Sequence, residues 1–208
     1  MSFDHPRFAQ RYTELAQHAE QRGQAEVRRE LVASAHGVVI EVGAGHGLTF
    51  AHYPPAVRGV VAVEPESTLR VHAHQASAQA PVPVAVVAGD AQHLPLATGS
   101  VDVVVFSLVL CSVRDPGVAF AEAVRVLRPG GSVLVYEHVR SQRLVVGALE
   151  RLVTPMWSRL AAGCHLDRDP LATATAAGLS VEEARRFGFS PGPGLPRVSH
   201  VLARARRQ

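Results

Sequence analysis

The chain has 208 residues, enough for one domain with a sizeable core, and its formal net charge is +3. All 21 basic side chains are arginine, which excludes a Schiff-base lysine, a P-loop lysine and a lysine general base. Two cysteines give no disulfide framework, and apolar runs long enough for a membrane span are absent. We therefore expect a cytoplasmic protein with no membrane-spanning segment.

The first helical pattern covers the polar segment Phe8–Ser34 and predicts one or two amphipathic helices. These helices either pack against the domain or form a lid over a bound cofactor. Short apolar runs then alternate with helical patterns, which predicts a parallel sheet covered on both faces. The predicted strands are Val38–Val42, Gly59–Val63, Val84–Ala88, Val101–Ser107 and Ser132–Glu137. Helices are expected between them at about Pro65–Ala78 and Pro116–Leu127, the second stopped by the proline and glycines of 128–131.

Three glycines at alternate positions, Gly43, Gly45 and Gly47, follow the first strand, and the acid Glu41 stands just before them. Such a turn lets a ligand approach the bare backbone, and we expect a helix after it whose N-terminal N–H groups face an anionic group. The spacing does not fit a dinucleotide fingerprint, because the position of its third glycine holds Leu48. An NAD-dependent oxidoreductase is therefore disfavoured.

Acidic side chains close the next two strands. Glu64 comes 17 residues after Gly47, near the offset at which an acid meets ribose hydroxyls in such folds. Asp90 ends the third strand, where its carboxylate could accept from an adenine amino group while the N–H of Ala91 donates to a ring nitrogen. Because parallel strands end at one edge of the sheet, we expect these groups to face one ligand.

The pattern after residue 140 is looser. It predicts a helix over Leu144–Ala161 ending at Gly163, a second over Asp169–Ala177, and an antiparallel pair. That pair is Ser180–Phe187 and Val198–Ala205, around the loop Pro191–Pro196. Arginines are scattered along the chain except at the tail, where Arg204, Arg206 and Arg207 indicate a solvated end rather than a nucleic-acid site.

These motifs resemble the small class I S-adenosylmethionine-dependent methyltransferases from about Phe8 to the C-terminus. The matching motifs are Glu41-Val-Gly-Ala-Gly-His-Gly47, Val63-Glu64-Pro65, Gly89-Asp90-Ala91 with Leu94-Pro95, Ser100–Val105 and Arg125-Val-Leu-Arg-Pro-Gly-Gly131. The resemblance implies an α/β, Rossmann-like, doubly wound fold with a mostly parallel seven-stranded sheet and an antiparallel C-terminal strand pair. It also implies S-adenosylmethionine as cofactor. The cofactor-binding residues it implies are Glu41, Gly43, Ala44, Gly45, Gly47, Glu64, Pro65, Asp90, Ala91 and Ser107.

A narrower resemblance is to the methyltransferase-like (type 11) subgroup that includes the alkyl thiol S-methyltransferases. It rests on Leu108–Val113, Glu137-His138-Val139, Pro155-Met-Trp157 and Gly163-Cys164. The chain departs from that pattern at His46, Thr49 and Ser199. The implied acceptor is a small, hydrophobic molecule, with a thiol as first choice and a quinone-like ring carbon or phenolic oxygen as the alternative. A cofactor-binding module without catalysis is the alternative from another class.

Methyl transfer from a sulfonium requires positioning, desolvation and, for some acceptors, removal of one proton. A thiol is partly ionised near neutral pH, whereas a carbon or phenol acceptor depends more on a base. His138 is the predicted catalytic base, with Glu137 orienting its ring or binding substrate; a structural or capping role is the alternative. Cys111 is expected to pack as a small hydrophobe, and the adjacent Cys164-His165 pair is too poor in ligands for us to predict a metal site.

We predict one domain, 1–208, in three parts: a helical lid (1–35), a cofactor-binding core (36–140) and acceptor-side helices with the final strand pair (141–208). The acceptor pocket is expected from Glu137–Cys164 and the N-terminal helices, with Pro155, Met156 and Trp157 either lining it or packing. The predicted partner is a small-molecule acceptor, and the oligomeric state stays open.

Overall fold

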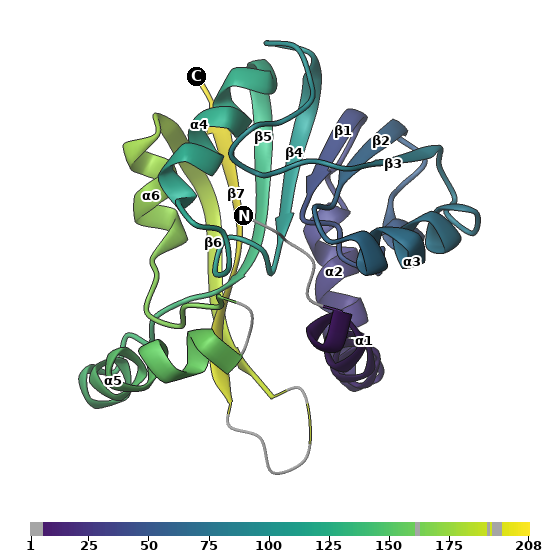
Figure 1. Ribbon diagram of the computed structural model, residues 1–208. Coiled ribbons are helices and arrows are strands. Elements are labelled where there is room, and N and C mark those ends of the chain that lie inside the picture. Colours follow the sequence, from purple (N-terminus) through teal and green to yellow (C-terminus); the bar gives the residue numbers. More distant parts are fainter. Residues whose placement is uncertain (1–5, 161–162, 191, 193–196) are drawn as a thin grey trace.

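Seven strands form one sheet in the computed structural model, which describes residues 6–160, 163–190, 192 and 197–208 (Figure 1). The strands are β1 (Gly37–Val42), β2 (Val57–Val63), β3 (Val84–Val87), β4 (Val101–Ser107), β5 (Leu127–His138), β6 (Leu179–Phe189) and β7 (Val198–Arg207). Their order is β3-β2-β1-β4-β5-β7-β6. The first five strands pair in parallel, whereas β7 runs antiparallel to both β5 and β6. The predicted mostly parallel sheet with an antiparallel C-terminal pair is confirmed.

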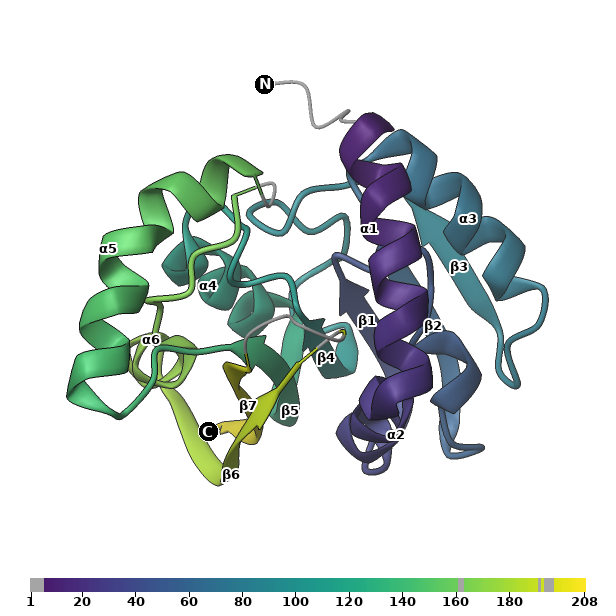
Figure 2. The same ribbon diagram turned by 90° about the horizontal axis from the view of Figure 1, so that it is seen from below.

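Helices cover both faces of this sheet. They are α1 (Pro6–Ala19), α2 (Ala25–Val32), α3 (Ser67–Ser77), α4 (Pro116–Val126), α5 (Leu144–Leu160) and α6 (Pro170–Ala176). Figure 1 shows α4 and α6 on one face and α2 and α3 on the other, while Figure 2 shows α1 and α5 on opposite sides of the molecule. None of the helices within the described residues is long and apolar enough to cross a bilayer.

The central strand β4 explains why the sheet has two cores. Its side chains alternate between the faces, so Val104 and Phe106 join the cluster that includes α4, while Val103 and Val105 join the cluster that includes α2. All four are at most 1 % exposed. A strand buried on both faces is expected to be a nearly continuous apolar run, and β4 is apolar from Val103 to Phe106, which is why it could be predicted from the sequence with its observed bounds.

The segment after the glycine turn differs from the prediction. In place of an α-helix, Phe50–His52 forms a single 3-10 turn, and Pro54 and Pro55 follow at once. Proline lacks the N–H that a helix interior needs, so the chain passes directly to β2. The predicted helix N-terminus is therefore not available to an anion at this position.

Strand β5 also begins earlier than predicted. Helix α4 starts with Pro116 in its first turn, where Asp115 accepts from Gly117 and Val118 N–H groups, and it ends at Val126. The strand begins at the next residue, and the extra residues of the proline–glycine segment form an irregularity where Val101 pairs with Leu127. Gly130 has φ 75°, a conformation that lets the chain bulge without strain.

At both ends of the chain the structure differs in detail from the predictions. The N-terminal helix is interrupted at Gly23, with φ 107°, inside a π-helical turn that separates α1 from α2. The arginine tail is the end of β7, where Arg204 pairs with Glu182 and the exposed Arg206 donates to the Gly130 carbonyl at 3.2 Å. Most of the predicted loop at 191–196, and residue 161 of the predicted helix, lie outside the described residues.

Candidate functional site

Hydrogen bonds join the glycine turn to the end of the second strand. The N–H of Gly45 donates to Glu64 Oε2 at 2.7 Å, and Glu66 N–H donates to the other oxygen at 2.9 Å. The N–H groups of Gly43 and Ala44 donate to the Val63 carbonyl at 2.8 and 3.1 Å. Burial raises the pKa of Glu64, while the two backbone hydrogen bonds lower it. The carboxylate predicted to bind ribose thus lies directly beside the turn predicted to hold the cofactor.

Packing gives two of the three turn glycines a structural role of their own. Gly43 has φ 68°, and a Cβ there would come within 2.2 Å of Val109 Cγ2. A Cβ on Gly47 would come within 2.7 Å of the Phe50 ring. Real Cβ atoms do not approach so closely, so neither position accepts a side chain even before a ligand is considered.

Glu41 is an acid at the end of β1, and it is buried, with 1 % of its surface exposed. The hydroxyl of Tyr53 donates to its Oε2 at 2.8 Å. Burial raises the pKa of Glu41 to about 7, while hydrogen bonds from Thr49 and Tyr53 and the charge of Arg28 lower it. A ligand ammonium beside this buried carboxyl would favour its ionised form and so lower its pKa.

A buried arginine completes the polar lining, and sequence reasoning missed it. Arg28 is 4 % exposed, and its guanidinium donates to Ser107 Oγ at 2.6 Å and to Glu20 Oε1 at 2.8 Å. The predicted polar helical segment carries several arginines, so the residue type alone does not single out Arg28. Its spacing was the available signal, because it lies one turn before the buried Leu31 and Val32 on the same helix face.

The third predicted contact point is a short loop after β3. Asp90 accepts from Gln92 N–H at 3.1 Å, and Gln92 Oε1 accepts from the N–H of Asp115 at 3.1 Å, which ties this loop to the start of α4. Ala91 is buried in the core. Nearby, Glu66 Oε2 caps α3 by accepting from Leu69 N–H, whereas its Oε1 is buried and has no hydrogen-bond partner among the described residues.

These acids and donors fit the S-adenosylmethionine expected from the sequence. Its amino group, carboxylate and ribose hydroxyls call for a buried acid, a cation and a further carboxylate, and the structure places Glu41, Arg28 and Glu64 near the ends of β1, β4 and β2. The unpaired Glu66 oxygen adds an acceptor that a ligand donor could satisfy. Which of these groups touch the cofactor stays a prediction.

Glu137 is fully buried and holds a loop. Its Oε1 accepts from the N–H groups of Val109 and Leu110, each at 2.6 Å, and its Oε2 from Cys111 N–H at 3.3 Å. Burial raises its pKa to about 7, and the hydrogen bonds lower it. This geometry makes Glu137 a positioning group for the loop after β4, and its predicted direct contact with substrate stays a prediction.

His138, at the end of β5, lies among sulfur atoms. Its Nδ1 is 3.7 Å from Cys164 Sγ, and Cys111 is part of the same cluster. The pKa of Cys164 lies well below its ordinary value because it interacts with Cys111, with His138 and with the Trp157 indole. Burial lowers the pKa of His138, but Cys164 and Glu137 raise it overall. Cys111 is buried as expected, yet it faces a second thiol rather than only apolar groups.

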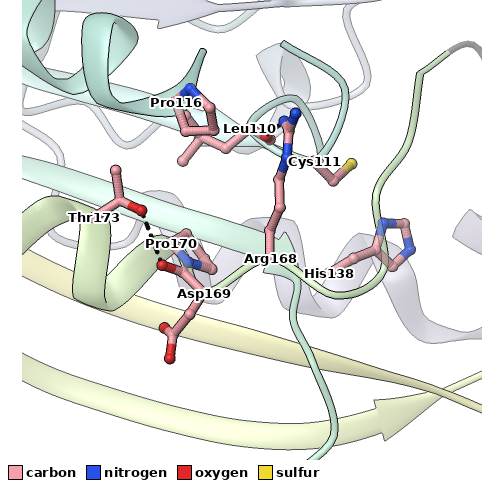
Figure 3. A pocket seen from close by; sticks show the side chains of 8 residues that line it. All are labelled: Leu110, Cys111, Pro116, His138, Arg168, Asp169, Pro170 and Thr173. Carbon is pink, nitrogen blue, oxygen red and sulfur yellow. Dashed lines mark hydrogen bonds between the residues drawn. The ribbon is translucent and has the colours of Figure 1, made fainter. Parts of the chain in front are cut away.

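A cavity of about 60 Å³ opens beside this cluster (Figure 3). It is lined by Leu110, Cys111, Pro116, His138, Arg168, Asp169, Pro170 and Thr173. The cavity thus extends to α4 and α6, beyond the segment 137–164 that the sequence indicates. Met156 is 65 % exposed and Trp157 is 41 % exposed, and neither lines it. Trp157 instead reaches the cluster through its contact with Cys164.

Comparisons with known proteins agree with this geometry. Residues 40–135 match the family model described as a methyltransferase domain. The chain is 32 % identical over 171 residues to thiol S-methyltransferase TMT1B of Rattus norvegicus, covering 80 % of this chain and 69 % of that protein. It is 36 % identical over 121 residues to a demethylmenaquinone methyltransferase of Renibacterium salmoninarum, covering 55 % of this chain and 49 % of that protein.

A solved S-adenosylmethionine-dependent methyltransferase of Thermotoga maritima has the same fold, with a TM-score of 0.72 at 21 % identity and 97 % coverage of both chains. The likeness in fold and the likeness in sequence point to one family. The chain belongs to the class I S-adenosylmethionine-dependent methyltransferases of the type 11 subgroup, and it is an enzyme with S-adenosylmethionine as cofactor.

Proposed function

We propose that this enzyme transfers the methyl group of S-adenosylmethionine to the sulfur of a small, hydrophobic thiol. The observation that carries the proposal is the extent of the match to a thiol S-methyltransferase, which covers 80 % of the chain. The match to a demethylmenaquinone methyltransferase covers 55 %. The longer match reaches beyond the cofactor motifs toward the segments that surround the cavity.

The donor would be held by the residues predicted from the sequence together with Arg28. In this proposal Glu64 binds the ribose hydroxyls, Asp90 and Ala91 bind the adenine, and Glu41 binds the amino group. Arg28 would bind the carboxylate, since it is a buried cation beside Ser107. Ala44, Gly45 and Pro65 would provide backbone contacts. When bound, the cofactor supplies a methyl group on a positively charged sulfur.

Arg28 of α2 donates a hydrogen bond to Ser107 at the end of β4, and this contact supports the idea that the N-terminal helices help to close the donor site. Residues 1–35 are therefore proposed as the lid of a single domain, with 36–140 binding the donor and 141–208 on the acceptor side.

The acceptor would enter the cavity beside β5. Leu110, Pro116 and Pro170 supply apolar lining, while His138 and Cys111 present polarisable groups. A volume of about 60 Å³ is small, so it suits the reacting end of a thiol better than a fused quinone ring. Removal of the acceptor proton is the one acid–base demand of the reaction, and His138 is the proposed acceptor of that proton.

An acceptor panel tests the proposal. Purified enzyme is given methyl-labelled donor with an alkyl thiol, a demethylated quinone-type ring or a phenol, and each product is identified by mass spectrometry. We expect label on the thiol sulfur and none on the ring or the phenol. Label on a ring carbon or a phenolic oxygen alone would replace the thiol proposal with the alternative that the demethylmenaquinone methyltransferase match supports.

A further inference from the structure

Three side chains of the kind that binds soft metal ions converge beside the cavity. The ligand atoms of Cys111, His138 and Cys164 all lie within 4.8 Å of one another. Figure 3 shows the Cys111 sulfur and the His138 ring on the same side of the cavity. We propose that this triad binds a soft divalent cation such as Zn²⁺, with a fourth coordination position open to the cavity. The inference rests on the proposed function in one respect, namely that the acceptor sulfur would take that open position.

The distances suit a tetrahedral ion. Zinc binds histidine nitrogen at about 2.0 Å and cysteine sulfur at about 2.3 Å, which places the two ligand atoms about 3.6 Å apart across a tetrahedral angle. The observed separation between His138 Nδ1 and Cys164 Sγ is 3.7 Å. Catalytic zinc sites use three protein ligands and one open position, and two cysteines with one histidine are one of the ligand sets that they use.

The fold brings the ligands together before any ion arrives. Cys111 lies in the loop after β4, His138 ends β5, and Cys164 follows α5. A backbone hydrogen bond of 2.8 Å from His165 N–H to the Cys111 carbonyl joins two of these segments. Glu137 fixes the third, because it precedes His138 and accepts from the Cys111 N–H. Both cysteines are buried, at 3 % and 6 % exposure, which limits competition from water.

The charges balance as well. Two thiolates and one neutral imidazole cancel the charge of a divalent cation, so a buried site of this kind leaves no net charge.

Arg168 lines the same cavity, but its Nη1 already donates to the carbonyls of Leu110 and Val113 at 2.5 and 2.7 Å. The neighbouring His200 packs against His138 with ring centroids 4.5 Å apart and the two rings tilted by 49°, and its own Nδ1 is hydrogen-bonded to the Val198 carbonyl at 2.9 Å.

Such a site would activate the acceptor without a base. A thiol that binds the ion loses its proton to solvent, because coordination stabilises the thiolate. The bound sulfur then uses a lone pair to form the new sulfur–carbon bond. The carbon–sulfur bond of the donor breaks, and its electron pair passes to the donor sulfur. His138 acts here as a ligand, in place of the proton-accepting role considered above.

Metal analysis tests the inference without any assay of methyl transfer. Protein loaded with Zn²⁺ and dialysed is expected to retain about one ion per chain. Cobalt in place of zinc should give the charge-transfer absorption of a thiolate–cobalt bond. Cys164→Ser and Cys111→Ser are each expected to lower metal affinity at least about tenfold, the scale on which losing even an outer-shell partner acts. His165→Ala is the matched control, because this imidazole adjoins Cys164 but lies outside the triad.

Wild-type protein that retains no ion, or a Cys164→Ser variant that retains as much as the wild type, overturns the inference. Wild-type titration needs no variant, so misfolding of a cysteine variant cannot hide a negative result; donor binding by calorimetry checks the fold of each variant. Metal binding that depends on both cysteines supports the site even if every thiol is inert, an outcome that removes only the proposed acceptor. Thiol methylation at full rate by metal-free protein overturns the proposed role of the ion in activating the acceptor and leaves the proposed function intact.

Discussion

The N–H of Gly45 donates to the carboxylate of Glu64 across 2.7 Å, which joins the glycine turn after β1 to the acid at the end of β2. Nineteen residues separate the two in sequence, yet they form one corner of the donor site. A ligand in this corner would meet the turn backbone and the carboxylate together, so changes at either residue should affect donor binding in related ways.

Gly45→Val is expected to abolish S-adenosylmethionine binding, as measured by calorimetry on folded protein. Gly45 has φ 58°, so a side chain costs about 1–2 kcal/mol in backbone strain and also occupies space at the turn. Gly99→Val is the matched control, since Gly99 has φ 63° and a Cβ added there would meet no other atom within 4 Å. It should show similar strain and normal donor binding. Unchanged affinity in Gly45→Val would remove the turn from the donor site.

Glu64→Ala is expected to weaken donor binding by roughly 1.5–3 kcal/mol, the scale of hydrogen bonds to a charged group. Asp90→Asn should weaken binding less, because the amide oxygen can still accept. Isothermal titration of both variants at one pH measures the difference. Equal and negligible losses would mean that the strand-end acids do not contact the donor.

Glu41 should give the fold a pH dependence of known sign. Burial raises its pKa from 4.5 to about 7, so the folded protein keeps a proton that the unfolded chain releases between these values. The contribution of Glu41 to stability is therefore fully present below the lower value and is lost as pH rises toward 7, by about 3 kcal/mol at most on the scale of 1.36 kcal/mol per unit.

Urea unfolding at pH 5 and pH 8 measures this effect, and Glu41→Gln should shrink the difference between the two pH values by about that amount. Wild-type donor affinity should rise over the same interval, because an ammonium favours the ionised carboxylate. The same pH response in wild type and Glu41→Gln would show that another group is responsible.

Trp157→Ala is expected to lower kcat/KM for the acceptor several-fold while the donor Kd stays near wild type. The indole contacts Cys164, and its loss should loosen the cluster beside the cavity. Met156→Ala is the control, because Met156 is its neighbour in α5 and is 65 % exposed. Loss of donor binding in a folded Trp157→Ala variant would place this segment in the donor site or the core.

The sequence was most informative where one local rule decides the structure. Strand β4 is buried on both faces, so its apolar run predicted its bounds, and the strand-end acid Glu64 lies beside the turn that was expected to hold the cofactor. The prediction of a helix after Gly47 is wrong. It rests on the glycine spacing alone, whereas the two prolines that follow leave room only for a short 3-10 turn. Cytoplasmic location and the three-part division of the domain stay predictions.

Contacts between distant segments could not be predicted from periodicity. Arg28 and Ser107 are 79 residues apart, and the helical spacing that places Arg28 on a buried face does not reveal this partner. Cys111 was expected to pack as a small hydrophobe, and local sequence indicates only that. The fold of three separate segments places it beside His138 and Cys164. Convergence of this kind depends on strand order, which the sequence alone leaves open.

A competition assay decides between thiol and ring methylation in a single reaction. The enzyme receives methyl-labelled donor and an equimolar mixture of an alkyl thiol and a demethylated quinone-type ring, and the label in each product is counted at low conversion. The ratio of the two products then reports the ratio of kcat/KM values. We predict label on the thiol sulfur in large excess over label on the ring. Label on the ring in excess, or on neither acceptor while donor binding is intact, would contradict the proposed thiol methylation.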